Sequence, residues 1–253
     1  MIGYSTVLVA VLIGIVPVFG FVWWFVSGGR EKMGLNLFMK TFFWGVLTAV
    51  PASIFQIINA NSSEGSVLIV LLQELFGGVN SYFVTHSLIP FLFVAIVEEG
   101  SKGLGIILSL RSFSHSPRVS KWRINPGTVA GVIVGLAFGV TENGVYFANN
   151  FATQGGSELI VSIIIMRFLL STSAHMIYSG LLGMFLVDFL VAKNFKGKII
   201  ALLGISLPVI IHTTFNILVT TAGLGVLTIP LLLFGLFVLI FRTVWPLFNG
   251  NKL

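Results

Sequence analysis

Several ionisable side chains lie inside stretches of this chain that are otherwise apolar enough to cross a membrane. Three of its eight acidic residues, Glu98, Glu99 and Glu142, are placed in this way, and so are two of its four histidines, His175 and His212. An ionisable group is costly to insert into hydrocarbon, so it is rare there and usually serves a function. These residues therefore predict a polar reaction centre enclosed by membrane-spanning helices.

Carboxylates and imidazoles around a dry cavity are suited to hydrolysing an amide bond. A carboxylate can take a proton from water and later pass it to the leaving amine, while His and Asn side chains can donate hydrogen bonds to the developing oxyanion. The chain has no cysteine and contains neither G-x-S-x-G nor H-E-x-x-H, so these nucleophile and zinc-protease motifs are absent. A zinc ion held by His175, His212 and one Glu would still satisfy the three-ligand rule for catalytic zinc. The residue types alone leave both routes to an activated water open.

The candidate residues occur as pairs on four successive apolar segments. Members of each pair are four residues apart, so they share one helix face. Glu99 lies about 100° around the helix from Glu98, and Asn143 lies beside Glu142. The pairs are Glu98 and Lys102, Phe138 and Glu142, His175 and Ser179, and His212 and Asn216. Glu98 and Lys102 can form an ion pair, which lowers the cost of burying both charges.

Composition places these segments in an integral membrane protein. Of the 253 residues, 56% are hydrophobic and only 9% are charged, and the mean hydropathy is +1.04; a soluble domain carries about 25% charged residues. We expect one all-α, polytopic helical bundle over residues 1–253. The net charge of +6 comes from short loops between apolar spans, so we expect a lipid bilayer as partner and no nucleic acid.

Hydropathy predicts seven membrane spans, each longer than the ~20 residues that a crossing helix needs. The first is read as a retained span, since no basic residue precedes its apolar run. Val67–Phe76 is apolar but too short to span, which predicts an interfacial or re-entrant segment. The fifth span is long enough to tilt strongly or to break near Ser171. The predicted spans are 3–26, 35–59, 83–110, 127–150, 158–192, 197–221 and 223–245.

Basic residues set the predicted topology. Loops on one side of the seven spans contain all of the Lys and Arg residues except Lys102 and Arg167. The positive-inside rule then places the N-terminus outside and the C-terminus in the cytoplasm of a cell-membrane protein. Arg167 is read as a structural residue that pairs with Glu158 or Glu99.

Depth and helix packing bring the polar pairs together. Measured from the cytoplasmic ends of their spans, the candidate carboxylates Glu98 and Glu142 and the two histidines lie about 18 to 25 Å deep. One layer can therefore contain all four, in the half of the membrane facing away from the cytoplasm. Glycines recur every four residues in the fourth span, which favours close contact between helix backbones and would bring Glu142 towards a neighbouring helix. These glycines are Gly127, Gly131, Gly135 and Gly139.

The four motifs resemble those of the PrsW family of intramembrane proteases, which is similar to the wider group that contains the type II CaaX prenyl endopeptidases. The motifs are Glu98-Glu99-x-x-Lys102, Phe138-x-x-x-Glu142-Asn143, His175 with Ser179, and His212-x-x-x-Asn216. They occur in order over a core of about residues 83–221. The second motif ends in Glu142, as in the PrsW branch, and the fourth ends in Asn216 rather than Asp.

The resemblance implies a role for each of these residues. Glu98 would be the base, Glu142 would help hold the water, and Lys102 and Glu99 would set the charge state of Glu98. An oxyanion or a metal would be held by His175, His212 and Asn216. Support would come from Phe138, Asn143 and Ser179. We favour the metal-free version, with zinc as the alternative; its ligands would be Glu98, Glu142, His175 and His212.

The implied function is cleavage of a membrane-anchored protein or peptide near the outer face, with anti-sigma-factor-like regulators as the substrate class. Two alternatives are a proton-coupled transporter, because relays use intramembrane Glu and His, and a catalytically inactive relative that binds membrane peptides. The sequence makes no prediction about the oligomeric state.

Overall fold

The structure is a computed structural model, which describes Gly20 and residues 33–61, 88–114, 125–154, 167–220, 225–229, 231–236 and 238. Regular elements among these residues are all helical, with no strand. The described part of the chain contains five long helices: α2 (Leu35–Asn61), α4 (Ile89–Ser114), α5 (Pro126–Gln154), α7 (Thr172–Val191) and α8 (Phe195–Thr220). A π-helical turn, η3 (Arg167–Ser171), leads directly into α7, and a 3-10 turn, η4 (Gly225–Leu227), follows α8.

Four of the helices are long and apolar enough to cross a membrane, over Leu35–Ile54, Pro126–Ala148, Thr172–Val191 and Phe195–Thr220. Helix α4 falls outside this set although its 26 residues would reach about 39 Å, because it carries Glu98, Glu99, Lys102 and Arg111. The all-helical membrane architecture agrees with the sequence. The count of seven spans stays a prediction, because nearly all of the first span (3–26) and part of the last (223–245) lie outside the described residues. The predicted interfacial or re-entrant segment Val67–Phe76 also lies outside them.

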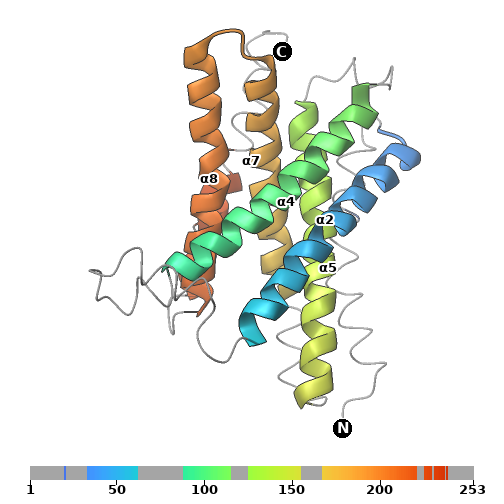
Figure 1. Cartoon of the computed structure of the whole chain (residues 1–253), viewed down its shortest axis with the longest axis vertical. Helices are drawn as coiled ribbons and strands as arrows, with labels where there is room; N and C mark the ends of the chain where they lie inside the picture. The colour runs from blue at the N-terminus through green and yellow to red at the C-terminus, as the bar shows by residue number, and fades with distance from the viewer. Residues whose placement is uncertain are drawn as a thin grey trace.

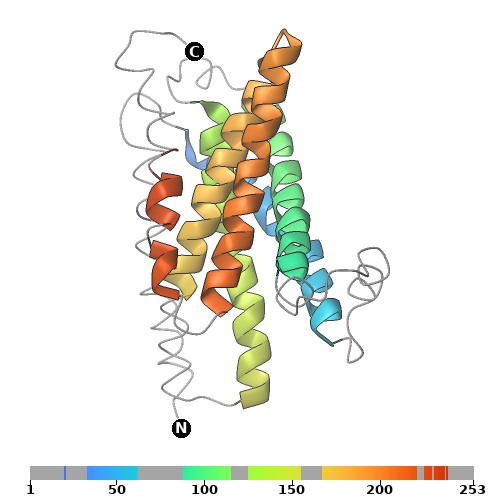
Figure 2. The same ribbon diagram turned by 90° about the vertical axis from the view of Figure 1, so that its left-hand side faces the viewer.

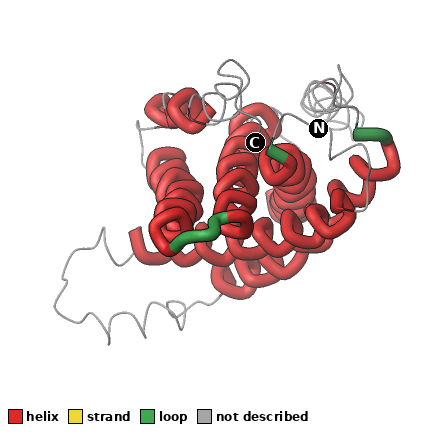
Figure 3. The backbone as a smooth tube through the Cα atoms, turned by 90° about the horizontal axis from the view of Figure 1, so that it is seen from above, coloured by secondary structure: helices red, strands yellow, loops and turns green. Residues whose placement is uncertain are grey.

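The long helices form two groups that cross each other (Figure 1). Helices α2 and α4 lie side by side and run obliquely across α5 and α7, and α8 packs against both α7 and α4. Seen from above, long helices viewed nearly end-on stand beside long helices that lie across them (Figure 3). The short helical turns after residue 225 lie beside α7 in the view of Figure 2, where Leu232 joins the buried core.

One end of the bundle collects the basic residues. Helix α2 begins, α4 ends, α5 begins, α7 ends and α8 begins at this end (Figure 1). The described cations near these helix ends are Lys40, Arg111, Lys193, Lys196 and Lys198. Their shared position agrees with the sidedness that the loop charges predict.

Apolar side chains are divided between the interior and the outer surface. Ile133, Leu136 and Leu181 are fully buried between α5 and its neighbours. On α8, Leu203 and Ile210 are more than half exposed, as expected for a helix that faces lipid on one side. The apolar outer surface is thus the lipid-facing surface of a membrane protein.

The glycine ridge of α5 packs against the backbone of α7. A Cβ atom at Gly131 would collide with the Ser179 carbonyl oxygen, and one at Gly135 would collide with the His175 carbonyl oxygen. A Cβ at Gly139 would lie 3.0 Å from His175 Cδ2. Close backbone packing of this kind is what small residues permit in membrane helices. It places His175 against the same stretch of α5 that carries Glu142.

Candidate active site

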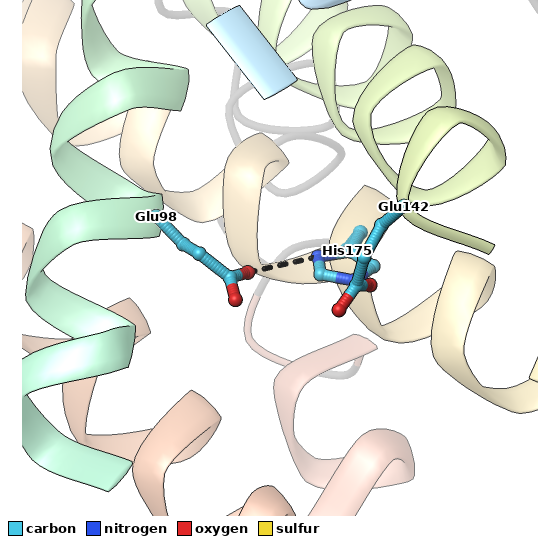
Figure 4. A group of neighbouring side chains, drawn as sticks. All are labelled: Glu98, Glu142 and His175. Carbon is cyan, nitrogen blue, oxygen red and sulfur yellow. Dashed lines mark hydrogen bonds and ion pairs between the residues drawn. The ribbon is translucent and has the colours of Figure 1, made fainter. Parts of the chain in front are cut away.

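Four of the described helices bring ionisable side chains to the centre of the bundle. Figure 4 shows Glu98 of α4, Glu142 of α5 and His175 of α7 pointing towards one another. His175 Nε2 lies 2.8 Å from Glu142 Oε2, and its Nδ1 lies 4.0 Å from Glu98 Oε2. His212 of α8 joins this group, with its Nε2 3.6 Å from Glu98 Oε2. Residues 98 and 212, far apart in sequence, therefore belong to one site.

Lys102 lies at the inner side of this group and is completely buried. Its ammonium Nζ donates to Glu99 Oε1 at 2.7 Å and lies 2.8 Å from His175 Nδ1. The predicted pair with Glu98 is present, at 3.4 Å from Glu98 Oε2. Glu99 is thus a closer partner of Lys102 than Glu98 is, which the angular separation of the two carboxylates on the helix did not indicate.

Glu99 also orients His212. Its Oε1 lies 2.8 Å from His212 Nδ1, and this oxygen belongs to a carboxylate that accepts from Lys102 as well. Because an ionised carboxylate only accepts hydrogen bonds, the proton of a neutral His212 is on Nδ1. Its Nε2 lone pair then faces Glu98. The Glu99 carboxylate supports the imidazole as carboxylates do in many hydrolytic centres.

Arg167 closes the outer side of the site and pairs with Glu142, not with Glu99. Its Nη2 lies 3.7 Å from Glu142 Oε1, and its Nε donates to Asn143 Oδ1 at 2.9 Å. The guanidinium carbon is 4.0 Å from the centroid of the Tyr146 ring. Asn143 in turn donates to Thr172 Oγ1 at 3.1 Å. Arg167 opens the π-helical turn η3, and such turns are frequent at functional sites.

Aromatic rings line the rest of the centre. Phe138 lies with its ring centroid 4.4 Å from Lys102 Nζ and 5.4 Å from the His175 ring. Tyr178, one turn after His175, stacks on His212 with ring centroids 5.3 Å apart. The Tyr178 hydroxyl is buried and has no hydrogen-bond partner among the described residues. Sequence reasoning did not select Tyr178, although its spacing of three from His175 places both on one helix face.

A cavity of about 370 Å³ opens beside these groups. Its wall combines the charged residues with apolar side chains, which is typical of ligand sites. Glu98, Glu142, His175, His212 and Asn216 line it, as the resemblance would require, and Arg167 and Tyr178 do so as well. The remaining lining residues are Phe91, Val94, Leu170, Ser171, Ala174, Phe215 and Val219.

Not every predicted residue faces this cavity. Glu99, Lys102 and Phe138 lie behind the lining residues, and Asn143 holds Arg167. Ser179 is fully buried, its carbonyl faces Gly131, and its hydroxyl has no partner among the described residues. The predicted supporting role of Ser179 therefore corresponds to packing against α5 rather than to contact with the cavity.

Charges in the site leave one carboxylate in excess. Among the described residues of the centre, Glu98, Glu99 and Glu142 face the two cations Lys102 and Arg167. Lys102 is closest to Glu99, and Arg167 contacts Glu142. Glu98 contacts Lys102 at the longer distance of 3.4 Å and also lines the cavity. This arrangement suits a carboxylate base with a second carboxylate across the cavity.

Three residues of the site have the side chains that a metal ion would need. Ligand atoms of Glu98, Glu142 and His175 all lie within 4.8 Å of one another, and three protein ligands are the usual number for catalytic zinc. The hydrogen bonds around them do not fit this use. Lys102 occupies His175 Nδ1, and Glu142 occupies His175 Nε2. In the described arrangement, His175 has no nitrogen left for a metal.

Comparison with known proteins agrees with this geometry. Residues 34–244 match the family described as PrsW family intramembrane metalloprotease, so the chain belongs to the PrsW family of intramembrane proteases and is an integral membrane protein. It is similar to "Protease PrsW" of Shouchella clausii (strain KSM-K16), with 25% identity over 224 residues, which cover 88% of this chain and 87% of that protein. No solved structure gives a significant match.

Replacing Arg167 tests whether the outer contacts position Glu142. Arg167→Met should lower the rate of substrate cleavage by about tenfold or more, because a residue that orients a catalytic group acts through sub-ångström placement. Arg167→Lys should restore only part of the rate, since an ammonium cannot reproduce the guanidinium contacts with Asn143 and Tyr146. Lys196→Met, at an exposed position on α8, is the matched control. Equal rates for Arg167→Met and the control would contradict this role.

Proposed function

We propose that this protein is an intramembrane endopeptidase that hydrolyses a peptide bond of a membrane-anchored substrate with a water activated by Glu98. The supporting observation is the meeting of two carboxylates and two imidazoles, from four helices, at one cavity in the bundle. Membership of a protease family supports the same reaction class. The roles of individual residues are part of this proposal.

Glu98 and Glu142 can hold the water between them. A water that donates one hydrogen bond to each of two carboxylates separates their oxygens by roughly 4.4 Å, given O–H···O distances of about 2.7 to 2.8 Å. The oxygens of Glu98 and Glu142 lie within 4.8 Å of each other. Glu142 is kept in place by His175 and Arg167. The lone pairs of such a water face the cavity, where the scissile carbonyl would lie.

Hydrolysis then follows general acid–base chemistry. Glu98 takes one proton as the water oxygen bonds to the carbonyl carbon, and the C=O π electrons move to the carbonyl oxygen. When the C–O double bond re-forms, the C–N bond breaks, and the proton on Glu98 passes to the leaving nitrogen. His212 Nε2 lies 3.6 Å from Glu98 Oε2, beside the carboxylate that takes this proton. No step requires a covalent enzyme intermediate.

The oxyanion needs donors that the two histidines do not supply in this arrangement. His175 gives its Nε2 proton to Glu142, and His212 gives its Nδ1 proton to Glu99. Tyr178 and Asn216 also line the cavity, and each can donate a hydrogen bond. We therefore assign the oxyanion to Asn216 and to the Tyr178 hydroxyl, which substrate binding must expose to the cavity because the hydroxyl is buried. This changes the role that the resemblance implied for His175 and His212.

The cavity lies towards the side of the bundle opposite its basic end. On α4, the lining residues Phe91 and Val94 precede Glu98, while on α8, Phe215 and Val219 follow His212. Both pairs are therefore displaced from the catalytic layer towards the helix ends remote from the cationic residues. With those cations in the cytoplasm, the substrate would be cut in the outer half of the cell membrane. Anti-sigma-factor-like regulators remain the predicted substrate class.

Removing the Tyr178 hydroxyl tests its assignment. Tyr178→Phe should lower kcat about 10²–10³-fold, the usual effect of losing one oxyanion donor. The unfolding temperature should stay the same or rise, because the buried hydroxyl has no partner among the described residues and such a group costs stability. Ser53→Ala removes another partnerless buried hydroxyl, on α2 and outside the cavity, and should leave kcat unchanged. An unchanged kcat in Tyr178→Phe would contradict the assignment.

The proposed function itself is tested with purified protein in liposomes that also contain a membrane-anchored peptide. Mass spectrometry should find two products whose masses sum to the peptide plus one water. Cleavage that vanishes in Glu98→Gln supports the proposal. Intact peptide that still binds the wild-type protein would indicate the inactive relative, and proton flux that depends on Glu142 without cleavage would indicate the transporter.

A further inference from the structure

We propose that Lys102 is a built-in cation that occupies the position a metal would need at His175, and that it fixes the tautomer of this histidine. In this proposal, Lys102 is a positioning residue: it acts on Glu142 and the reacting water through His175. The inference deepens the proposed function by specifying that its centre works without a metal on His175. Its tests use no substrate.

The first observation is the surroundings of the ammonium. Lys102 Nζ has three acceptors within reach, namely Glu99 Oε1 at 2.7 Å, His175 Nδ1 at 2.8 Å and Glu98 Oε2 at 3.4 Å. An ammonium has three N–H donors, so the number of donors matches the number of acceptors. The Phe138 ring covers a further side at 4.4 Å, a distance suited to cation–π attraction. The charge is thus fully enclosed by groups that stabilise it.

The second observation is the consequence for His175. Because an ammonium cannot accept a hydrogen bond, His175 Nδ1 must be the acceptor of its contact with Lys102. A neutral imidazole then carries its proton on Nε2. That proton is donated to Glu142 Oε2, 2.8 Å away. Lys102, His175 and Glu142 form a directed chain in which the lysine determines what His175 offers to the catalytic carboxylate.

This pattern is the reverse of the one that supports a metal ligand. A histidine that binds a metal through one nitrogen usually donates the other N–H to a carboxylate or carbonyl. Here the group opposite Nδ1 is itself a donor, so Nε2 keeps its proton and has no lone pair for a metal. The Nδ1 side is closed as well, because zinc would need to come within about 2.1 Å of a nitrogen that already has an ammonium 2.8 Å away.

His212 provides the internal comparison. Its Nδ1 faces the Glu99 carboxylate at 2.8 Å, which is the arrangement expected behind a metal ligand, and its Nε2 faces Glu98. The partner at Nδ1 is thus an anion for His212 and a cation for His175. Lys102 is the residue that makes this difference, and its position three residues after Glu99 and four after Glu98 lets one side chain reach both carboxylates.

The tautomer can be measured directly. Solid-state NMR of ¹⁵N-histidine-labelled protein in lipid would report the protonation of each ring nitrogen, and the His175 signals would be assigned by their loss in His175→Gln. At His175, we expect a protonated Nε2 and an unprotonated Nδ1. His212 should show the opposite tautomer, with the proton on Nδ1. A protonated Nδ1 at His175, or a His175 signal shifted by a bound metal in protein as purified, would overturn the proposal.

A zinc titration tests whether Lys102 keeps zinc from binding His175. Wild-type protein should bind no stoichiometric zinc through His175, whereas Lys102→Met should bind zinc at least about tenfold more tightly, and that gain should disappear when His175→Gln is added. Lys196→Met, which removes a cation at an exposed position on α8, should bind zinc as the wild type does. Zinc that binds the wild type stoichiometrically and is lost in His175→Gln would overturn the proposal, as would equal zinc affinity of the wild type and Lys102→Met.

Removing a buried cation can also prevent folding, because it leaves buried carboxylates unpaired. The double variant Glu99→Gln, Lys102→Met removes one charge of each sign, and the glutamine amide oxygen can replace the carboxylate oxygen that His212 contacts. It should fold and show the same gain in zinc affinity. A folded double variant with wild-type zinc affinity would refute the proposal that Lys102 keeps zinc from His175. A failure of peptide cleavage alone would count against the proposed function and not against these readouts.

Discussion

Glu98→Gln should reduce the rate of peptide cleavage by roughly 10²–10⁴-fold, the range expected for loss of a general base. Glutamine keeps the size of the side chain and can still accept a hydrogen bond from Lys102, but it cannot take a proton from water. The other described carboxylate that lines the cavity, Glu142, is already engaged by His175 and Arg167, so it should replace Glu98 poorly as the base. Initial rates in liposomes at saturating substrate would measure the effect.

The control for Glu98→Gln is the same chemical change away from the cavity. Asp188→Asn converts a carboxylate to an amide near the basic end of α7 and should leave the rate unchanged. Thermal unfolding in detergent should give Glu98→Gln at least the stability of the wild type, since burying an amide costs less than burying a charge. Cleavage by a folded Glu98→Gln protein at the wild-type rate would show that another group activates the water.

Gly131→Ala should have the largest effect on folding. The added Cβ would overlap the Ser179 carbonyl oxygen and carbon and lie 3.0 Å from Gly180 Cα. These are backbone atoms of α7, so the two helices must separate, and overpacking of this kind costs typically 1–3 kcal/mol. The separation would also move His175 and Glu142 apart. We expect a lower unfolding temperature together with at least about a tenfold loss of cleavage.

Gly144→Ala is the matched control on the same helix. Nothing lies within 4 Å of a Cβ built at Gly144, and alanine is favoured over glycine in a helix by about 1 kcal/mol. This variant should be as stable as the wild type or more stable, and it should keep its activity. If both alanine variants behaved alike, the ridge of α5 would not be in close contact with α7.

Much of the fold could be predicted from the sequence because a membrane imposes simple requirements. Long apolar segments must be helical in lipid, and their basic ends gather on one side, as the described helix ends show. The long fifth span was expected to tilt strongly or to break near Ser171, and at this place the structure has the π-helical turn η3, which leads directly into α7. Exact ends were less predictable: the span expected to end at residue 110 is helical as far as Ser114, because polar and apolar residues mix at the membrane boundary. Residues 83–87, at its other end, lie outside the described residues.

The site was predictable to the extent that spacing along a helix determines it. Ordered pairs on four segments indicated that Glu98, Glu142, His175 and His212 could share one layer, and the structure brings them together. Contacts between helices were not predictable in the same way. Arg167 was expected to pair with Glu99 or with Glu158, which lies outside the described residues. Among the described residues it contacts Glu142 and not Glu99, because a one-dimensional pattern does not show which faces of two helices meet.

Contacts of Lys102 and Tyr178 show the same limit. Lys102 was expected to pair with Glu98 four residues away, yet it also reaches His175, which is 73 residues further along the chain. Tyr178 has an ordinary aromatic position in an apolar helix, and only its stacking on His212 and its partnerless hydroxyl draw attention to it. Features that depend on the relative rotation of two helices require the structure.

Photo-crosslinking tests most directly whether a membrane peptide occupies the cavity beside Glu98. A photo-reactive phenylalanine analogue would be placed in the Glu98→Gln protein at Phe215, which lines the cavity, or at Ile210, which lies on the exposed surface of the same helix. The account predicts that a bound membrane-anchored peptide crosslinks to position 215 and not to position 210. Crosslinking at position 210 with none at 215 would contradict it.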